Sequence, residues 1–231
     1  NDLSAEDMLW GQTLRSPYPS AKIRKIDFSQ ALAIEGVHAI LTADDVPGEN
    51  LFGLEHPDQP VLAFDMVRYV GEPVAIVAAN HPEVAKKAID AIYVDYEQLD
   101  PLVNSREAIE AAPIHPDGNV IRHLVINHGD PDAVGNITVE GEYEVGMQDQ
   151  AFLGTESGIA FPSADGGVDL HISTQWLHSD RDQVASALNL PEDLVRVTLA
   201  GVGGAFGGRE DVSMHVHLCM LALHTGLSLI H

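Results

Sequence analysis

The residues best suited to chemistry by type and spacing lie in one stretch, Gly201-Val-Gly-Gly-Ala-Phe-Gly-Gly-Arg-Glu-Asp211. Five of the chain's 20 glycines fall within residues 201–208, here called the glycine loop. An apolar run, residues 194–199, precedes it and predicts a buried strand, and a helical pattern begins near Asp211. Glycine permits positive φ and lets a ligand approach backbone N–H groups, and a helix N-terminus adds unpaired amides and a positive dipole. The pattern predicts a binding loop for an anionic ligand.

The two common phosphate-binding motifs do not fit this loop. A P-loop needs Lys and Ser/Thr where Arg209 and Glu210 stand. A dinucleotide fingerprint counted from Gly201 has Phe206 at its third glycine position, where close helix packing requires a small residue. Glu210 would also repel a phosphate. The residues alone leave open a nucleotide-binding enzyme that uses Gly201–Gly208, and a glycine-rich turn without a ligand.

Gly203-Gly-Ala-Phe-Gly-Gly-Arg-Glu210 resembles the signature loop of the molybdenum-binding subunit in the xanthine dehydrogenase/aldehyde oxidase family. In that family a glutamine on the preceding strand lies 31 residues before the loop phenylalanine, and here Gln175 lies 31 residues before Phe206. The resemblance covers nearly the whole chain, in family order. It includes residues 148–162 and three stretches similar to the family's hammerhead domain, residues 15–23, 42–48 and 70–75.

The resemblance implies a role for four residues. The Gln175 amide is expected to hydrogen-bond an oxygen ligand on molybdenum, and the backbone amides of Phe206 and Gly207 to lie against the metal's apical ligand. Gln175 and Phe206 would thus contact the metal centre through its ligands. Glu210 is expected to bind the edge of a purine ring, because family members that oxidise aldehydes tend to have an apolar residue there. The alternatives are a structural amide at Gln175, a core aromatic at Phe206 and a helix-capping acid at Glu210.

Other reactive side chains follow the glycine loop. Arg209 replaces the lysine common in the family, and both a surface role and a cofactor-phosphate role stay open. His215, His217, Cys219 and His224 invite a zinc interpretation, but helical spacing divides them between two faces of an apolar helix. Burial in that apolar run would raise the pKa of the Cys219 thiol and leave it unreactive.

Strands interleaved with helices predict an α+β fold. The resemblance divides it into a hammerhead α/β domain (1–112), a connector rich in Pro and Gly (113–132) and the first, incomplete part of a molybdopterin-binding α+β domain (133–231). Residues 137–145 alternate apolar and polar side chains and predict a strand with one face in water. The other expected strands are 8–14, 21–28, 37–41, 67–70, 74–79, 92–96, 157–161, 168–174 and 194–199, and the helices are 29–34, 81–91 and 180–189.

Composition excludes several classes of function. Hydrophobic residues make up 45% of the chain and charged residues 20%, which argues against disorder. The net charge of −23 disfavours nucleic acid and anionic membranes as partners, and no stretch approaches the roughly 18 apolar residues of a membrane span. One cysteine cannot form an internal disulfide and favours a reducing compartment, the cytoplasm. A start without Met and an end at His231 just after a helix suggest a piece of a longer protein.

The resemblance also implies an activity for a complete enzyme: hydroxylation of an electron-poor carbon of a small N-heterocycle, as in purine metabolism, with oxygen from water. Molybdenum–molybdopterin would bind the complete subunit, and iron–sulfur clusters and FAD would lie on partner domains or subunits. The family's glutamate base lies in its C-terminal half, and no residue before His231 matches its motif. The chain alone is therefore expected to lack a catalytic residue, cofactor and activity. A noncatalytic assembly module with an acidic docking surface is a further alternative.

Overall fold

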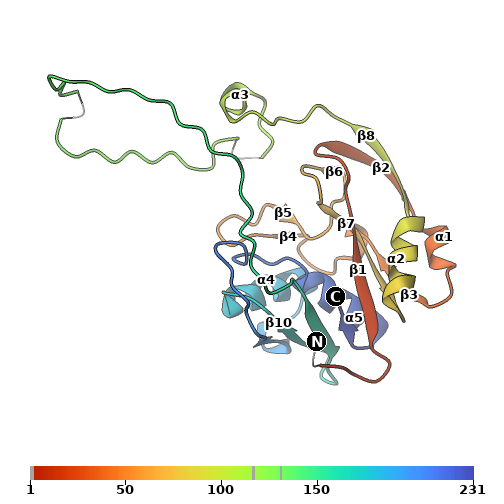
Figure 1. Cartoon of the computed structure of the whole chain (residues 1–231). Helices are drawn as coiled ribbons and strands as arrows, with labels where there is room; N and C mark the ends of the chain where they lie inside the picture. The colour runs from red at the N-terminus through yellow and green to blue at the C-terminus, as the bar shows by residue number, and fades with distance from the viewer. Residues whose placement is uncertain (1–2, 116–117, 131) are drawn as a thin grey trace. The chain divides into compact units, whose positions relative to one another are not determined.

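The structure, a computed structural model, describes residues 3–115, 118–130 and 132–231. Its contacts divide into two compact units (Figure 1). The first contains Asn1–Pro101 together with Gln150–His231, and the second contains Leu102–Asp149. The first unit therefore combines both ends of the chain in one body. Residues 116, 117 and 131 of the predicted connector lie outside the described residues.

The strands of the first unit are β1 (Leu9–Arg15), β2 (Ala21–Asp27), β3 (Val37–Leu41), β4 (Leu51–Phe52), β5 (Gln59–Pro60), β6 (Met66–Val67), β7 (Pro73–Ala79), β8 (Tyr93–Gln98), β9 (Gly158–Pro162), β10 (Val168–Ile172), β11 (Val195–Leu199) and β12 (Leu229–Ile230). Its helices are α1 (Ser29–Leu32), α2 (Pro82–Ala91), α4 (Leu177–Leu188) and α5 (His215–Thr225), with short 3-10 turns η1 (Ala43–Asp45) and η2 (Glu192–Leu194).

A seven-stranded sheet, in the order β11-β10-β9-β12-β1-β7-β3, forms the centre of the first unit. Its first four strands come from the C-terminal part of the chain and its last three from the N-terminal part. The two groups meet where β1 and β12 pair in parallel, with Leu9 opposite Leu229 and Trp10 opposite Ile230. β10 and β11 are also parallel, whereas β1, β7 and β3 pair antiparallel.

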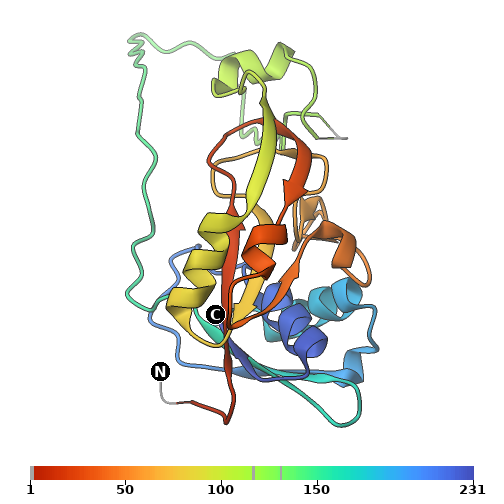
Figure 2. The same cartoon turned by 90° about the vertical axis from the view of Figure 1, so that its right-hand side faces the viewer.

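The sheet is covered on both faces because its central strand β7 is buried on both sides. Alternate side chains of β7 enter two separate apolar clusters: Ile76 packs in the cluster that contains Leu218 of α5, and Val77 packs in the cluster that contains Ala88 of α2. Figure 2 shows the blue α5 and the yellow α2 on opposite sides of the red strand β1. A strand of apolar residues without alternation, such as Pro73–Ala79, is the expected sequence for such a position.

A three-stranded sheet, β6-β2-β8, packs beside this core over a small cluster that includes Ala21, Val67 and Val74. A two-stranded pair, β4 and β5, completes the first unit. Over the described residues, no helix combines the length and apolar character needed to cross a bilayer.

The second unit contains one helix among its described residues, α3 (Ser105–Glu110), which the Asn104 side chain caps. The strand predicted over residues 137–145 is wrong, since the structure assigns no strand there and leaves Ile137 and Val139 86% and 88% exposed. An alternating pattern produces a strand only when a second strand supplies the hydrogen-bonding ladder. None of the described strands pairs with this segment.

The mixed sheets and helices agree with the predicted α+β class. Most predicted strands lie within a residue or two of the observed ones, although β6 is shorter than expected. α4 begins at Leu177, three residues before the predicted start, and α5 begins at His215 rather than near Asp211. The domain boundaries at residues 112 and 132 stay predictions, because the division into compact units follows contacts within this chain alone.

Candidate functional site

Gln175 and the glycine loop leave the sheet at the same end of two neighbouring strands. β10 and β11 run parallel and in register, and Gln175 follows the first while the loop follows the second. Ala200 N donates to Ile172 O at 2.9 Å, and Ser173 Oγ donates to Gly201 O at 2.6 Å. The carboxyl ends of parallel strands are the usual place for ligands in sheets of this kind. The fold therefore brings the two predicted segments side by side.

A tight turn at residues 205–208 exposes two backbone amides. It is closed by a 2.9 Å hydrogen bond from Gly208 N to Ala205 O. Both central residues have positive φ, 51° at Phe206 and 84° at Gly207. This conformation costs phenylalanine about 1 kcal/mol, and Phe206 is 77% exposed. Within the described residues neither Phe206 N nor Gly207 N has an acceptor, and a side chain at Gly207 would meet nothing within 4 Å. The turn offers two unused donors to open space.

Two other glycines of the loop are required by packing. A Cβ on Gly203 would lie 2.5 Å from Gly154 N, and a Cβ on Gly208 would lie 2.8 Å from Phe152 Cε1. Real Cβ atoms do not approach other atoms so closely. One side of the loop thus packs on the segment before β9, while the other side is open.

Arg209 joins the loop to this same segment from inside the protein. Only 4% exposed, it donates from Nη2 to Gly154 O, and its guanidinium carbon lies 4.3 Å from the centre of the Phe152 ring. Its Nε lies 3.1 Å from Glu156 Oε1. The surface role left open by the sequence is therefore wrong. Nη1 has no hydrogen-bond partner among the described residues, so a contact with a cofactor phosphate stays a prediction.

Phe152, Gly154 and Glu156, which support the loop from below, were not singled out as site residues from the sequence. They lie in the stretch of residues 148–162 that resembles the family. That resemblance was the available signal, because no local pattern links them to a loop roughly fifty residues later. Their partners become visible only in the folded chain.

Gln175 and Glu210 are exposed, as expected of residues that meet a ligand. Gln175 lines a pocket of about 260 Å³ together with Trp176 and Leu199. The residues that line this pocket do not include residues 206–207 or Glu210. The structure brings the predicted site residues to one end of the sheet but not into one shared pocket. Their assignment to cofactor and substrate stays a prediction.

The helix expected to complete the anion-binding loop begins too late to do so. α5 starts at His215, seven residues after Gly208. Between them, Asp211 Oδ1 accepts a 3.0 Å hydrogen bond from Val212 N, which shapes a local turn in place of a helix. The first-turn amides of α5 therefore do not belong to the loop, and the predicted contribution of a helix N-terminus is wrong. This weakens the nucleotide-binding alternative, since phosphate loops use that terminus.

The histidines and the cysteine of α5 lie mainly in the core. His217 Nε2 lies 2.8 Å from Val61 O and its Nδ1 3.5 Å from Thr13 Oγ1. Burial lowers the pKa of His217 to about 4 and raises the pKa of Cys219 above its ordinary value. In the part of the chain that the structure describes, no group of three or more His, Cys, Asp or Glu side chains is arranged to hold a metal.

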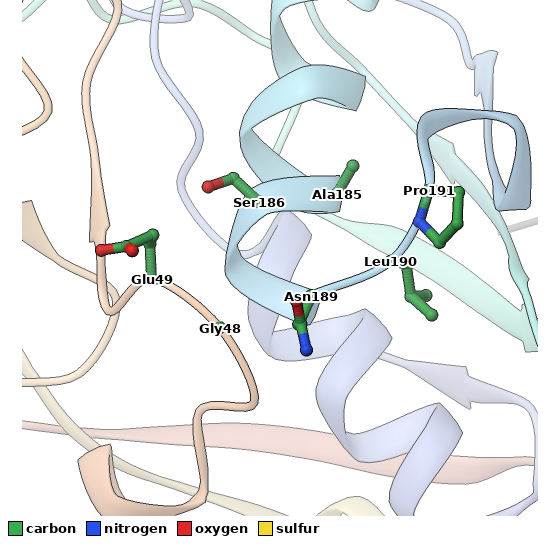
Figure 3. A pocket seen from close by; sticks show the side chains of 7 residues that line it. All are labelled: Gly48, Glu49, Ala185, Ser186, Asn189, Leu190 and Pro191. Atoms are coloured by element: carbon green, nitrogen blue, oxygen red, sulfur yellow. The ribbon is translucent and has the colours of Figure 1, made fainter.

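A wider pocket of about 530 Å³ lies at the other end of α4 (Figure 3). Gly48 N donates to Ala187 O at 2.9 Å, and a Cβ on Gly48 would lie 2.1 Å from Ser186 O. Glu49 is the one charged residue among those lining the pocket. The close backbone contact explains the glycine, and the lining offers no second charged group with which to do chemistry.

Two family models match the chain. The aldehyde oxidase and xanthine dehydrogenase a/b hammerhead domain matches residues 1–100, and the molybdopterin cofactor-binding domain matches residues 114–229, half of the chain. The chain belongs to the xanthine dehydrogenase/aldehyde oxidase family of molybdenum hydroxylases. The family predicted from the glycine loop and Gln175 is thus confirmed, and so is the predicted fold class of a hammerhead domain followed by part of a molybdopterin-binding domain.

Curated relatives of this molybdenum hydroxylase chain are longer than the chain itself. It is 38% identical over 230 residues to a probable xanthine dehydrogenase subunit from Bacillus subtilis, covering 97% of this chain and 31% of that protein. It is 37% identical over 229 residues to the nicotinate dehydrogenase large molybdopterin subunit of Eubacterium barkeri, covering 97% of this chain and 54% of that protein. The chain therefore spans about a third and about half of these two relatives.

Solved structures of molybdenum hydroxylases share the fold. Quinoline 2-oxidoreductase from Pseudomonas putida 86 matches with a TM-score of 0.84 and 28% identity, over 99% of this chain and 31% of that chain. Aldehyde oxidoreductase from Desulfovibrio gigas matches with a TM-score of 0.90 and 24% identity, over 98% of this chain and 27% of that chain. At the lower identity the likeness concerns the fold alone.

Proposed function

We propose that this chain contributes to a xanthine dehydrogenase-like molybdenum hydroxylase that oxidises an electron-poor carbon of a purine or another N-heterocycle with oxygen from water. The observation that carries the proposal is the unpaired amides of Phe206 and Gly207, which leave the sheet at the same end as the Gln175 amide. A family match alone gives the class of enzyme; these donors indicate which residues of this chain would meet the cofactor.

The residues at this end of the sheet suit a group that bears oxygen ligands. Phe206 N and Gly207 N point to no acceptor within the described residues, and the glycine leaves space in front of them. The Gln175 amide is a neutral donor, so it adds no fixed charge beside a centre that changes oxidation state. When bound, molybdenum–molybdopterin supplies the two-electron oxidation of the substrate carbon. The three donors would hold its oxygen ligands and orient the group toward the substrate.

Glu210 would select the substrate. An exposed carboxyl group can accept a hydrogen bond from a ring N–H, or donate one when protonated, and an N-heterocycle offers such an edge. A simple aldehyde does not offer this second contact. The relatives named for xanthine, nicotinate and quinoline are named for N-heterocycles, which supports the heterocycle over the aldehyde.

The remaining machinery would come from outside these 231 residues. No residue of the chain fits the family's glutamate base, and we place the iron–sulfur clusters and FAD on partner domains or subunits. The chain alone is therefore expected to be inactive and not to retain the cofactor. Its one cysteine is consistent with a cytoplasmic enzyme.

The test is to purify the complete molybdenum subunit with its electron-transfer partners and measure bound molybdenum. Xanthine, nicotinate, quinoline and benzaldehyde are then assayed in water enriched in heavy oxygen. We expect molybdenum in the protein and heavy oxygen in the heterocyclic product. Replacing Glu210 with Leu should lower kcat/KM for the heterocycle by about 10- to 100-fold, with a smaller change for benzaldehyde. Glu35→Leu, a change at an exposed acid in the same fold unit, is the control.

Three results would count against the proposal. Protein without molybdenum that only docks partners would favour the assembly module. Micromolar binding of ATP or NAD in calorimetry would favour the nucleotide enzyme. Equal effects of Glu210→Leu on the heterocycle and on benzaldehyde would remove Glu210 from substrate recognition.

A further inference from the structure

A buried polar pair, Asp180 and His215, connects the two segments on which the proposed site depends. Asp180 lies in the first turn of α4, five residues after Gln175, and is 1% exposed. His215 is the first residue of α5, five residues after Glu210, and is 2% exposed. His215 Nε2 lies 3.6 Å from Asp180 Oδ2. Removing an acid and an imidazole from water is costly, so their burial calls for an explanation.

On one side, Asp180 fixes the backbone around Gln175. Thr174 Oγ1 donates to Asp180 Oδ2, and the same hydroxyl accepts a 3.0 Å hydrogen bond from Trp176 N. These contacts lie on the residues immediately before and after Gln175. Burial raises the pKa of Asp180, the hydroxyl of Thr174 opposes that rise, and the charge of Asp211 adds to it.

On the other side, His215 fixes the segment that follows Glu210. Ser213 N donates to His215 Nδ1 at 3.1 Å. Nδ1 therefore carries the lone pair, and the proton of the neutral ring lies on Nε2, which faces Asp180. Burial lowers the pKa of His215 to about 4, so the ring is neutral at pH 7. Ser213 Oγ donates to Glu156 Oε2 at 3.0 Å, and that carboxylate also contacts Arg209.

These contacts form one polar network that reaches from both neighbours of Gln175 to Arg209, the residue before Glu210. The step between Asp180 and His215 joins its two halves. Within the described residues, Asp180 Oδ1 and His215 Nε2 have no hydrogen-bond partner. Apolar side chains of similar volume would fill this space without the cost of burying ionisable groups. Stability alone is thus a weak reason for the pair, and geometry is a better one.

We propose that Asp180 and His215 are positioning residues that set the orientation of Gln175 relative to the glycine loop. This inference rests on the proposed function, because that orientation matters for catalysis only if the cofactor binds to both. Neither residue contacts cofactor or substrate in this role. Asp180 acts through Thr174, and His215 acts through Ser213 and Glu156.

Four substitutions separate the contacts. In His215→Asn the amide oxygen can replace Nδ1 and keep the contact with Ser213 N, but the side chain no longer reaches Asp180. His215→Gln does the reverse. Asp180→Asn keeps an acceptor for Thr174 and for His215 without the charge, whereas Asp180→Val removes both contacts. Asp182→Val is the control, a change on the same helix at a side chain that is 51% exposed.

The experiment uses the complete subunit with its partners and has two readouts. In hydrogen exchange followed by mass spectrometry, Asp180→Val and His215→Asn should each raise exchange about tenfold in peptides covering residues 173–177 and 205–213. In steady-state kinetics the same variants should lower kcat about tenfold and leave KM within about twofold, because a displaced Gln175 affects the reacting group rather than substrate binding. Asp180→Asn should restore both readouts to nearly the original values, and Asp182→Val should change neither.

Unchanged exchange in both peptides of a folded Asp180→Val or His215→Asn protein would overturn the inference, as would a failure of Asp180→Asn to restore kcat. If Asp180→Val does not fold, His215→Asn decides the matter, because it keeps the contact with Ser213. The proposed function fails separately, through an original protein without molybdenum or turnover. In that case the exchange measurement still shows whether the pair couples the two segments.

Discussion

The two sides of the glycine loop differ in what they do for the protein. On the closed side, Gly203, Gly208 and Arg209 pack against residues 152–156, and backbone or ring atoms fill the space where side chains would be. On the open side, the turn at residues 206–207 carries positive φ and two amides without acceptors. The same short stretch therefore separates stability from binding. Changes on the closed side should unfold the chain, and changes on the open side should alter what it binds.

The largest effect is expected from acid, which acts on the closed side and on the core behind it. Burial lowers the pKa of His215, His217 and His231 to about 4 each. Because an unfolded histidine titrates near pH 6.5, the unfolded chain binds protons first as the pH falls. The stabilisation is complete above about pH 6.5 and is lost toward pH 4, by up to about 1.4 kcal/mol per pH unit for each histidine. Raised pKa values of Asp180 and Glu72 act in the opposite direction and reduce the slope.

Urea unfolding of the chain at pH 7 and pH 5 measures this slope. His217→Gln should flatten it, and His38→Gln, a change at an exposed histidine, should not. A chain equally stable at both pH values would show that the buried histidines do not hold the closed side together.

A smaller loss is expected from Gly203→Ala. The added Cβ would lie 2.5 Å from Gly154 N and 2.6 Å from its Cα, so the backbone must shift. We expect the free energy of unfolding to fall by about 3 kcal/mol, measured by urea titration followed by circular dichroism. Gly201→Ala is the matched control, since its Cβ would meet nothing within 4 Å, and it should change stability by less than about 0.5 kcal/mol. Equal losses in the two variants would end the distinction between the sides.

The smallest effect, and one of opposite sign, is expected from Phe206→Gly. Glycine adopts positive φ without strain, and the 77% exposed phenylalanine buries little surface. The chain should become more stable by about 0.5 kcal/mol, after allowing for the greater freedom of glycine in the unfolded state. Differential scanning calorimetry checks the shift. A loss above about 1 kcal/mol would mean that the Phe206 side chain supports the turn and that the open side also contributes to stability.

Regular elements were predictable from the sequence wherever the pattern depends on the segment itself. The apolar run of β7 and the hairpin between β9 and β10 are examples, and their predicted bounds are nearly those of the structure. The strand at residues 137–145 failed because a strand also needs a partner. The start of α5 failed because a local turn at Asp211 competes with the helix.

The candidate site divides in the same way. Spacing and family resemblance identified Gln175, Phe206, Gly207 and Glu210, and the parallel strands do bring these segments together. The buried contacts of Arg209 could not be predicted, because its partner Gly154 lies 55 residues away along the chain. The pair Asp180 and His215 was missed for the same reason.

Strand β12 has only two residues, yet it lies between β9 and β1 and closes the sheet. The sequence matched by the hammerhead model and the sequence matched by the cofactor-binding model therefore share one hydrogen-bonded ladder. A chimera that takes its first hundred residues from one relative and the rest from another must keep Leu9 and Trp10 compatible with Leu229 and Ile230. The two modules are inherited as neighbours in sequence but must change together at this seam.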